Sequence, residues 1–490
     1  MTKPIRLHPE NPKLFEFRGK PLVLVTATEH YGAVMNRPFL FEKYLADAAK
    51  KKITLTRLFT LFRELQLANN PYSTCKPESP DYVAPFKRVG PGKALDGEPQ
   101  YDLDVWNPEF FERLHGFLSL ASKYGIIVEV TLFSNTYCDE VWNLNPLHPK
   151  NNINGLKDIK WAEYITCRHP ELFKRQKAYL HKILLETNRY DNIIYELCNE
   201  PGGGFNLPES PSVEEVNAWL KTVAREIRRT EAGLKNKHLI SGQEAFVYFP
   251  WEQPTTRSFR DFPVDIVNMH SSHLWSNTSY DGKSYDHGEF MKKKLRLERI
   301  RDYCLDTYPE KKPLNFDEDN SASCYKDLPA WLIHRKRAWA ALFGGAHYDY
   351  IDFSIVNYRE TGSPEAQKYI RTWMKHLSEY IHSIDLVNAR PVPQIVKKYP
   401  SPTLPFVLAV EGKDYNIYLV DKRELEEKGY GKPLCGSITC ELPAGVYELA
   451  FYSPVTGRYS TRRTLTGSRE TRIKLPEFTH DIVLRLRKKK

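Results

Sequence analysis

The chain has 490 residues, of which 41% are apolar and 27% charged, so it can bury a sizeable core and is not disordered overall. The net charge of +10 is mild for this length and no nucleic-acid-binding module is recognisable, so no nucleic acid partner is expected. The longest apolar runs fall short of the roughly 20 residues that a membrane helix needs, so no membrane partner is expected.

The opening residues, MTKPIRLHPENPK, contain no apolar stretch of the kind that a secretion signal has. The sequence as it stands predicts a cytoplasmic protein, and a secreted or periplasmic one if a leader has been removed. The eight cysteines are scattered without a CxxC pair, so neither a zinc site nor a redox motif is indicated. No cofactor is expected, and the sequence does not predict an oligomeric state.

Residues 1–388 alternate strand-like and helix-like segments. The strand candidates are short and continuously apolar, which is typical of strands buried on both faces of a parallel sheet. There are eight, at 21–27, 53–59, 126–133, 192–199, 238–243, 264–270, 312–318 and 346–353.

Helix start signals lie between these strands. Asn107-Pro108 gives an N-cap followed by proline, with Gly125 as a stop, and Ser212 with Glu215 forms a capping box. Eight strand–helix units close most economically as a (β/α)₈ barrel. A doubly wound open sheet is the alternative, but the glycine-rich loop that it usually carries after its first strand is absent. The connection from about 62 to 105, rich in proline and glycine, is expected to overhang one mouth of the barrel.

The alternation of strand-like and helix-like segments ends near residue 390, where Arg-Pro-Val-Pro (390–393) is typical of a linker. Short strands separated by glycine, proline and aspartate follow at 406–410, 416–420, 437–442, 446–452, 458–465, 471–475 and 481–486. They predict a small antiparallel β-sandwich domain over 389–490. We expect it to pack against the barrel; glycan binding by it is the alternative.

Barrel enzymes work at the carboxyl ends of their strands. The fourth strand ends in Asn199-Glu200 and the seventh in Asp317-Glu318-Asp319, on opposite sides of the mouth. Two facing carboxylates are what glycoside hydrolysis needs, one to protonate the leaving oxygen and one to attack the anomeric carbon.

Three segments carry a resemblance to a known group of enzymes. IIYELCNEP resembles the fourth strand of the clan A retaining glycoside hydrolases, the cellulase-like TIM barrels, which implies Glu200 as acid/base and Asn199 as its partner on the sugar. ITLTRLF resembles the clan's second strand, whose arginine supports the nucleophile and matches Arg57. KPLNFDEDN is similar to the strand that carries the nucleophile, which matches Glu318.

The sequence departs from the clan's pattern in two places. The clan usually has a tryptophan at the end of the eighth strand as a floor for the sugar, whereas YDYIDFSIV has none. Either Tyr348, Tyr350 or Phe353 serves instead, or the floor is missing. The nucleophile segment holds three acids, which leaves Asp317 or Asp319 as alternatives to Glu318.

Further substrate-binding residues are expected in the loops that follow the strands. These are Glu29, His30, Trp142, His270, His273 and Trp275. Core packing explains Trp142 nearly as well, and two histidines alone do not make a metal site, so no metal is expected. Glu129 lies mid-strand and is expected to join an internal ion pair, for instance with Arg57.

The sequence therefore predicts a glycosidase that cleaves O-glycosidic bonds of an oligo- or polysaccharide with retention of configuration. An inactive carbohydrate-binding barrel is the first alternative, and a metal-dependent barrel hydrolase the second. The sugar, its linkage and exo or endo action are not predicted.

Overall fold

The computed structural model describes residues 3–28, 32–63, 79–205, 207–247, 257–270, 296–319 and 328–489. Within these ranges, no helix combines the length and the apolar character needed to cross a bilayer.

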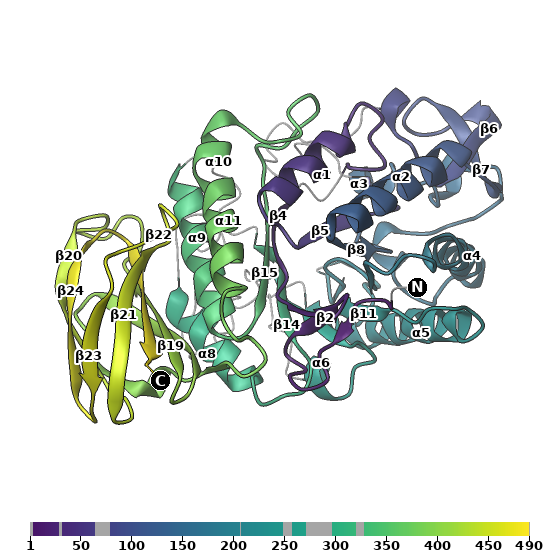
Figure 1. Cartoon of the computed structure of the whole chain (residues 1–490). Coiled ribbons are helices and arrows are strands. Elements are labelled where there is room, and N and C mark those ends of the chain that lie inside the picture. The colour runs from purple at the N-terminus through teal and green to yellow at the C-terminus, as the bar shows by residue number, and fades with distance from the viewer. Residues whose placement is uncertain are drawn as a thin grey trace.

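A closed barrel of eight parallel strands forms the larger part of the molecule (Figure 1). The strands are β4 (Val25–Thr28), β5 (Leu55–Phe59), β8 (Ile127–Thr131), β9 (Ile193–Glu196), β11 (Leu239–Gly242), β13 (Ile266–Asn268), β14 (Leu314–Asp319) and β15 (His347–Ile351). Each lies beside its neighbour in this series, and the amide of Thr54 donates to the carbonyl of Val25 at 3.1 Å where the first two meet. The predicted barrel is thus confirmed, and the doubly wound alternative is excluded.

Helices cover the outside of the barrel. They are α1 (Phe41–Lys50), α2 (Pro108–Tyr124), α3 (Asp139–Trp142), α4 (Pro170–Thr187), α5 (Val213–Ala232), α6 (Arg257–Arg260), α8 (Leu297–Thr307), α9 (Leu328–Phe343), α10 (Pro364–Lys368) and α11 (Ile370–Ile381). The predicted caps are present: the side chain of Asn107 accepts from the amide of Glu109, and Gly125 ends α2 in the left-handed conformation. Ser212 and Glu215 form the capping box of α5.

The bottom of the barrel is closed by a small sheet that the sequence did not predict. It consists of β1 (Arg6–Leu7), β2 (Phe15–Phe17) and β3 (Lys20–Leu22), so the predicted strand at 21–27 is divided between β3 and β4. Phe15 and Phe17 pack against apolar residues at the beginnings of the barrel strands, among them Leu55 and Ile127. This arrangement leaves the opposite end, at the strand carboxyl termini, for a site.

The long connection after β5 is more regular than expected. Its described part holds an antiparallel hairpin of β6 (Phe86–Lys93) and β7 (Pro99–Trp106), which the sequence did not predict, and the expected overhang of one mouth stays a prediction. Two further short strands, β10 (Gly202–Gly203) and β12 (Phe246–Val247), pair in parallel just beyond β9 and β11.

The C-terminal part consists of antiparallel sheets, as predicted. One sheet has the order β16-β18-β19-β25-β21-β22, with β23 paired to β21, and the other the order β17-β20-β24. The strands are β16 (Arg390–Pro391), β17 (Val396–Lys398), β18 (Thr403–Val410), β19 (Asp414–Asp421), β20 (Leu434–Cys440), β21 (Gly445–Ser453), β22 (Arg458–Tyr459), β23 (Arg463–Gly467), β24 (Thr471–Phe478) and β25 (Asp481–Lys488). The expected linker at 390–393 is wrong in part, because Arg390 and Pro391 form an edge strand of the larger sheet.

Barrel and sandwich share a core, with α9 and α11 between them (Figure 1). Trp339 of α9 is fully buried and stacks on Tyr418 of β19, with ring centroids 5.5 Å apart. Arg335 of α9 donates two hydrogen bonds, of 3.0 and 2.8 Å, to the carboxylate of Asp481 in β25. The predicted boundary at residues 388 and 389 falls between α11 and β16, and a division into two domains there stays a prediction.

Candidate active site

Arg57 lies at the centre of a buried ionic cluster inside the upper half of the barrel. It projects from β5 and is fully buried. Its Nη1 donates to Oε2 of Glu318 at 2.8 Å and its Nη2 donates to Oδ1 of Asn199, also at 2.8 Å. Both nitrogens Nε and Nη2 contact the carboxylate of Glu196, and Oδ2 of Asp317 lies 3.2 Å from Nη2. One guanidinium thus contacts three carboxylates, one from β9 and two from β14, and the amide of a residue just beyond β9.

Glu200 reaches the same space from just beyond β9. One of its carboxylate oxygens, one of Glu318 and a ring nitrogen of His270 all lie within 4.8 Å of one another. The backbone of Glu200 has a φ of 45°, a strained conformation for a non-glycine residue that is often found at functional sites. A side chain on Gly203 would meet the backbone of Ser212 at 2.9 Å, so the glycines that follow permit close packing of the chain behind Glu200.

A β-bulge decides which acids of β14 face the barrel interior. Side chains alternate along a regular strand, but the pairing of β14 with β15 shifts register between Phe316 and Asp319. Asp317 and Glu318 therefore both reach Arg57, although they are adjacent in sequence.

Asp319 points away from this cluster, toward α9. It accepts from Nη1 of Arg337 at 2.9 Å and from the hydroxyl of Tyr348 at 2.5 Å. Burial would raise the pKa of Asp319, but the charge of Arg337 outweighs it and holds that pKa well below its usual value. Asp319 is thus an ionised structural group outside the barrel interior.

His270, at the end of β13, lies between the two glutamates. Its Nδ1 is 3.0 Å from Oε1 of Glu200, and its Nε2 is 3.6 Å from Asp317 and 3.9 Å from Glu318. Burial alone would lower the pKa of His270, but the carboxylates of Glu318 and Asp317 outweigh it and raise that pKa well above its ordinary value. These carboxylates therefore favour the imidazolium form of His270, whose Nδ1 lies within hydrogen-bond distance of Glu200.

Glu129 does not take the ion-pair role expected of it. Its Oε1 instead accepts from the hydroxyl of Ser241 at 2.5 Å and from Nδ2 of Asn268 at 2.9 Å. Burial raises the pKa of Glu129 to about 8, and the charge of Glu196 adds to this effect. The partner that binds Arg57 through two nitrogens is Glu196, which sequence reasoning missed. An acid within the apolar run IIYELCN was the signal that could have found it.

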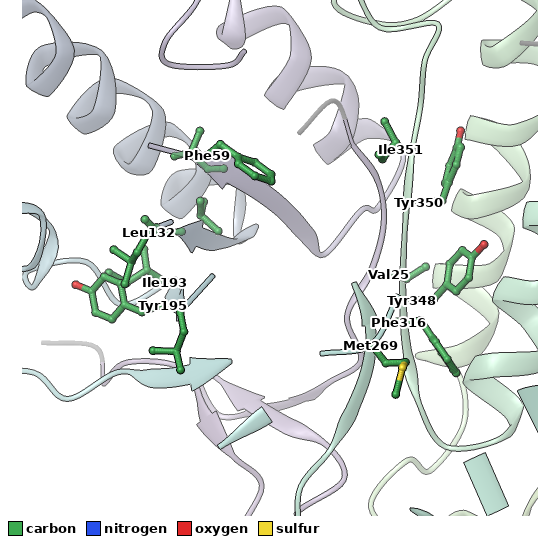
Figure 2. Packing of buried hydrophobic residues seen from close by; sticks show 14 of the residues in the cluster. Val25, Phe59, Leu132, Ile193, Tyr195, Met269, Phe316, Tyr348, Tyr350 and Ile351 are labelled. Carbon is green, nitrogen blue, oxygen red and sulfur yellow. The ribbon is translucent and has the colours of Figure 1, made fainter. Parts of the chain in front are cut away.

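The aromatic residues expected to contact sugar are largely buried elsewhere. The rings of Tyr348 and Tyr350 point toward the helices outside the barrel (Figure 2), where Tyr350 packs on His334 of α9 with centroids 4.5 Å apart. Trp142 is 1% exposed, and its indole donates to the carbonyl of Ile159 at 3.1 Å. The sugar-contacting role expected of Tyr348, Tyr350 and Trp142 is therefore wrong, and core packing explains all three.

Part of the predicted site falls outside the described residues. Glu29, His30, His273 and Trp275 belong to this group. The sugar-contacting roles proposed for them stay predictions.

Two polar residues that follow β8 were also missed by sequence reasoning. Nδ2 of Asn199 donates to the hydroxyl of Tyr137 at 2.8 Å and to that of Ser134 at 3.2 Å. With Arg57 on its oxygen, the Asn199 amide is held in one orientation beside Glu200. Nothing in the segment from Ser134 to Tyr137 singles these residues out, because polar residues after a strand are common.

Comparison with known proteins supports this architecture. No protein-family model matches the chain. An endoglucanase of Clostridium saccharobutylicum is 23% identical over 172 residues, 32% of this chain and 34% of that relative, so the chain spans about a third of its length.

Solved structures match over far more of the chain. A glycoside hydrolase of family 5 from Bacteroides vulgatus has a TM-score of 0.63 and 12% identity over 99% of this chain and 92% of its own. Another structure, of a glycoside hydrolase, has a TM-score of 0.63 and 11% identity over 99% and 97%. An endo-1,4-beta-mannanase from Rhizomucor miehei reaches 0.50, with 12% identity over 78% of this chain and all of its own.

At such identities the likeness establishes the fold alone. The chain has the cellulase-like TIM-barrel fold of the family 5 glycoside hydrolases, of clan A, followed by a C-terminal β domain.

Proposed function

We propose that this protein is a retaining glycoside hydrolase that cleaves O-glycosidic bonds of an oligo- or polysaccharide. The observation that carries the proposal is the pair of facing carboxylates, with oxygens of Glu200 and Glu318 within 4.8 Å of each other. Retaining glycosidases hold their two carboxyl groups about 5–5.5 Å apart, whereas inverting enzymes need about 6.5–9.5 Å to admit a water molecule.

Glu318 suits the role of nucleophile because a cation favours its ionised form. Arg57 donates to Oε2 of Glu318 at 2.8 Å. In the first step a Glu318 oxygen attacks the anomeric carbon while Glu200 gives its proton to the glycosidic oxygen, and the C–O bond to the leaving group breaks. In the second step Glu200 takes a proton from water, whose oxygen displaces Glu318 and restores both carboxyl groups.

The geometry also bears on the two alternative nucleophiles. Asp319 is turned toward Arg337 and away from Glu200, which argues against it. Asp317 lies within the cluster, but its side chain is shorter than that of Glu318 and contacts Arg57 and His270. We assign Asp317 the positioning of these two cations, and attack on the substrate to Glu318.

Chemical rescue tests the assignment once a screen of nitrophenyl glycosides has found a substrate. Glu318→Ala should lose turnover, and azide should restore release of the phenol with formation of a glycosyl azide of inverted configuration. Glu171→Ala, at a glutamate of α4 whose side chain is 76% exposed, is the matched control and should keep full activity. Wild-type turnover by Glu318→Ala would remove this glutamate from the mechanism.

The acid/base role is tested by the leaving group. Glu200→Gln should lower turnover of a glycoside with a poor leaving group by about 10²–10⁴-fold. A dinitrophenyl glycoside, whose leaving group needs little protonation, should suffer much less in the bond-breaking step. Equal losses with both substrates would contradict general acid catalysis by Glu200.

A metal-dependent hydrolase is the second candidate, because Glu200, His270 and Glu318 could together ligate an ion. A histidine must be deprotonated to bind a metal, so an ion would have to displace the proton that the neighbouring carboxylates favour on His270. Activity that survives exhaustive chelation would dispose of this candidate. Glycan binding without turnover across a broad substrate panel would instead favour an inactive carbohydrate-binding barrel.

A further inference from the structure

A pocket outside the candidate active site lies between α11 and the end of that helix on one side and the larger sheet of the sandwich on the other. It encloses about 300 Å³ and its lining includes Tyr380, Glu448, Tyr452, Tyr459, Arg462 and Arg485. We call it the interdomain pocket. None of its residues belongs to the cluster around Arg57, so it is separate from the candidate active site.

Tyr459 offers an aromatic surface that is fixed in place. The residue is 44% exposed, while its ring packs on that of Tyr452 with centroids 4.9 Å apart. Its hydroxyl accepts from Nη1 of Arg485 at 3.2 Å. Arg485 is itself held by Asp414 at 2.7 Å and by the hydroxyl of Ser383 at 2.8 Å. Little conformational entropy of the Tyr459 side chain would therefore be lost when a ligand stacks on its ring.

The charges around the interdomain pocket balance one another locally. Arg485 and Arg487 both face Asp414, at 2.7 and 3.7 Å. Arg462 pairs with Glu448 at 3.2 Å. The lining therefore presents donors and acceptors side by side. This pattern suits vicinal hydroxyl groups and is unlike an anion site, where donors alone would converge.

The exposed ring of Tyr459, together with the neighbouring donors and acceptors, indicates a sugar as the ligand. A sugar ring has an apolar face of C–H groups that packs on an aromatic ring, and hydroxyls that both donate and accept hydrogen bonds. A volume of about 300 Å³ is at the small end of the range for ligand sites and has room for one or two rings. We propose that the interdomain pocket binds one or two units of a neutral saccharide, as a second site remote from the barrel mouth. The proposal is independent of catalysis and would hold for an inactive barrel as well.

Affinity electrophoresis of the full chain tests the proposal. Native gels would contain neutral polysaccharides (hydroxyethylcellulose, glucomannan, galactomannan, xyloglucan) or acidic ones (alginate, polygalacturonate). At least one neutral polymer should retard the wild type, and Tyr459→Ala should bind it about tenfold more weakly, a loss of about 1.4 kcal/mol. Tyr459→Phe, which keeps the ring, and Tyr399→Ala, at another sandwich tyrosine that is 43% exposed, should bind like the wild type.

Parallel variants separate this site from the barrel mouth. Retardation that persists in Glu318→Gln but is lost in Tyr459→Ala assigns binding to the interdomain pocket, whatever becomes of the catalytic proposal. Arg462→Ala, at a side chain that is 66% exposed, gives the same reading should Tyr459→Ala fold poorly. The proposal is overturned if no neutral polymer retards the protein, if only acidic polymers do, or if the pocket variants bind like Tyr399→Ala.

Discussion

The ion pair between Arg335 and Asp481 offers a direct measure of how firmly barrel and sandwich are joined. The side chains are 1% and 0% exposed and share two hydrogen bonds. The hydroxyl of Tyr418 also donates to Asp481, at 3.1 Å. Arg335→Met removes the cation and leaves a buried carboxylate without its charge partner. Breaking one side of such a pair costs about 3–5 kcal/mol.

Urea unfolding followed by tryptophan fluorescence would measure this loss. The double variant Arg335→Met/Asp481→Asn removes both charges and keeps an acceptor for Tyr418, so it should be more stable than Arg335→Met alone. Lys397→Met breaks an exposed pair with Glu441, whose two side chains are 46% and 51% exposed, and should change stability by less than about 1 kcal/mol. The reasoning is refuted if Arg335→Met costs no more than Lys397→Met, or if the double variant loses the sum of its two single changes.

Three further changes test the core and the site. Removing the sandwich after residue 389 should give insoluble protein, because Trp339 and Phe343, both fully buried, would be exposed; solubility of the product measures this. Arg57→Met should lower kcat at neutral pH by at least about tenfold and move the acidic limb of the pH–rate profile upward by about 1–3 units, because Glu318 loses the cation that favours its ionised form. Glu129, whose folded pKa is about 8 against an ordinary 4.5, makes the fold less stable as pH rises from about 4.5 to 8, so Glu129→Gln should flatten the dependence of urea unfolding over that range.

Contrary outcomes are equally specific. A soluble, fully active barrel after truncation would show that the shared core is dispensable, and weaker polysaccharide binding by it would favour a binding module. An unchanged acidic limb in Arg57→Met would mean that Glu318 ionises without help. A Glu129→Gln variant with the wild-type pH dependence of stability would show that this carboxyl does not titrate as its burial implies.

Much of the fold could be predicted because a parallel barrel produces a strong sequence signal. Strands covered on both faces have to be apolar throughout, and eight such runs marked the eight barrel strands. The hairpin of β6 and β7 gave a weaker signal, since Gly90-Pro91-Gly92 interrupts the alternation that reveals an exposed strand. The edge strand at Arg390 and Pro391 was equally hard to predict, because a proline-rich segment is typical of a linker as well as of a strand at the edge of a sheet.

The site was predictable only where topology fixes the position of a residue. Arg57 lies within β5, Glu318 near the end of β14 and Glu200 just beyond β9, and the barrel topology brings their side chains together toward the rim that the strand ends share. The choice of Glu196 over Glu129 as the partner of Arg57 depends on the stagger between strands, which the sequence does not contain. Glu129 is level with Arg57 in the pairing of β5 and β8, yet the side chains do not form an ion pair.

The bulge in β14 has a consequence for transferring residue roles between remote homologues. In a regular strand, successive side chains point to opposite faces of the sheet, so every second residue lines the barrel interior. Here the adjacent residues Asp317 and Glu318 both contact Arg57 in the barrel interior, because the register shift in β14 interrupts the alternation of side chains. An alignment displaced by one residue would assign the role proposed for Glu318 to Asp317 or Asp319, so superposed coordinates are the sounder guide when this segment is compared with distant relatives.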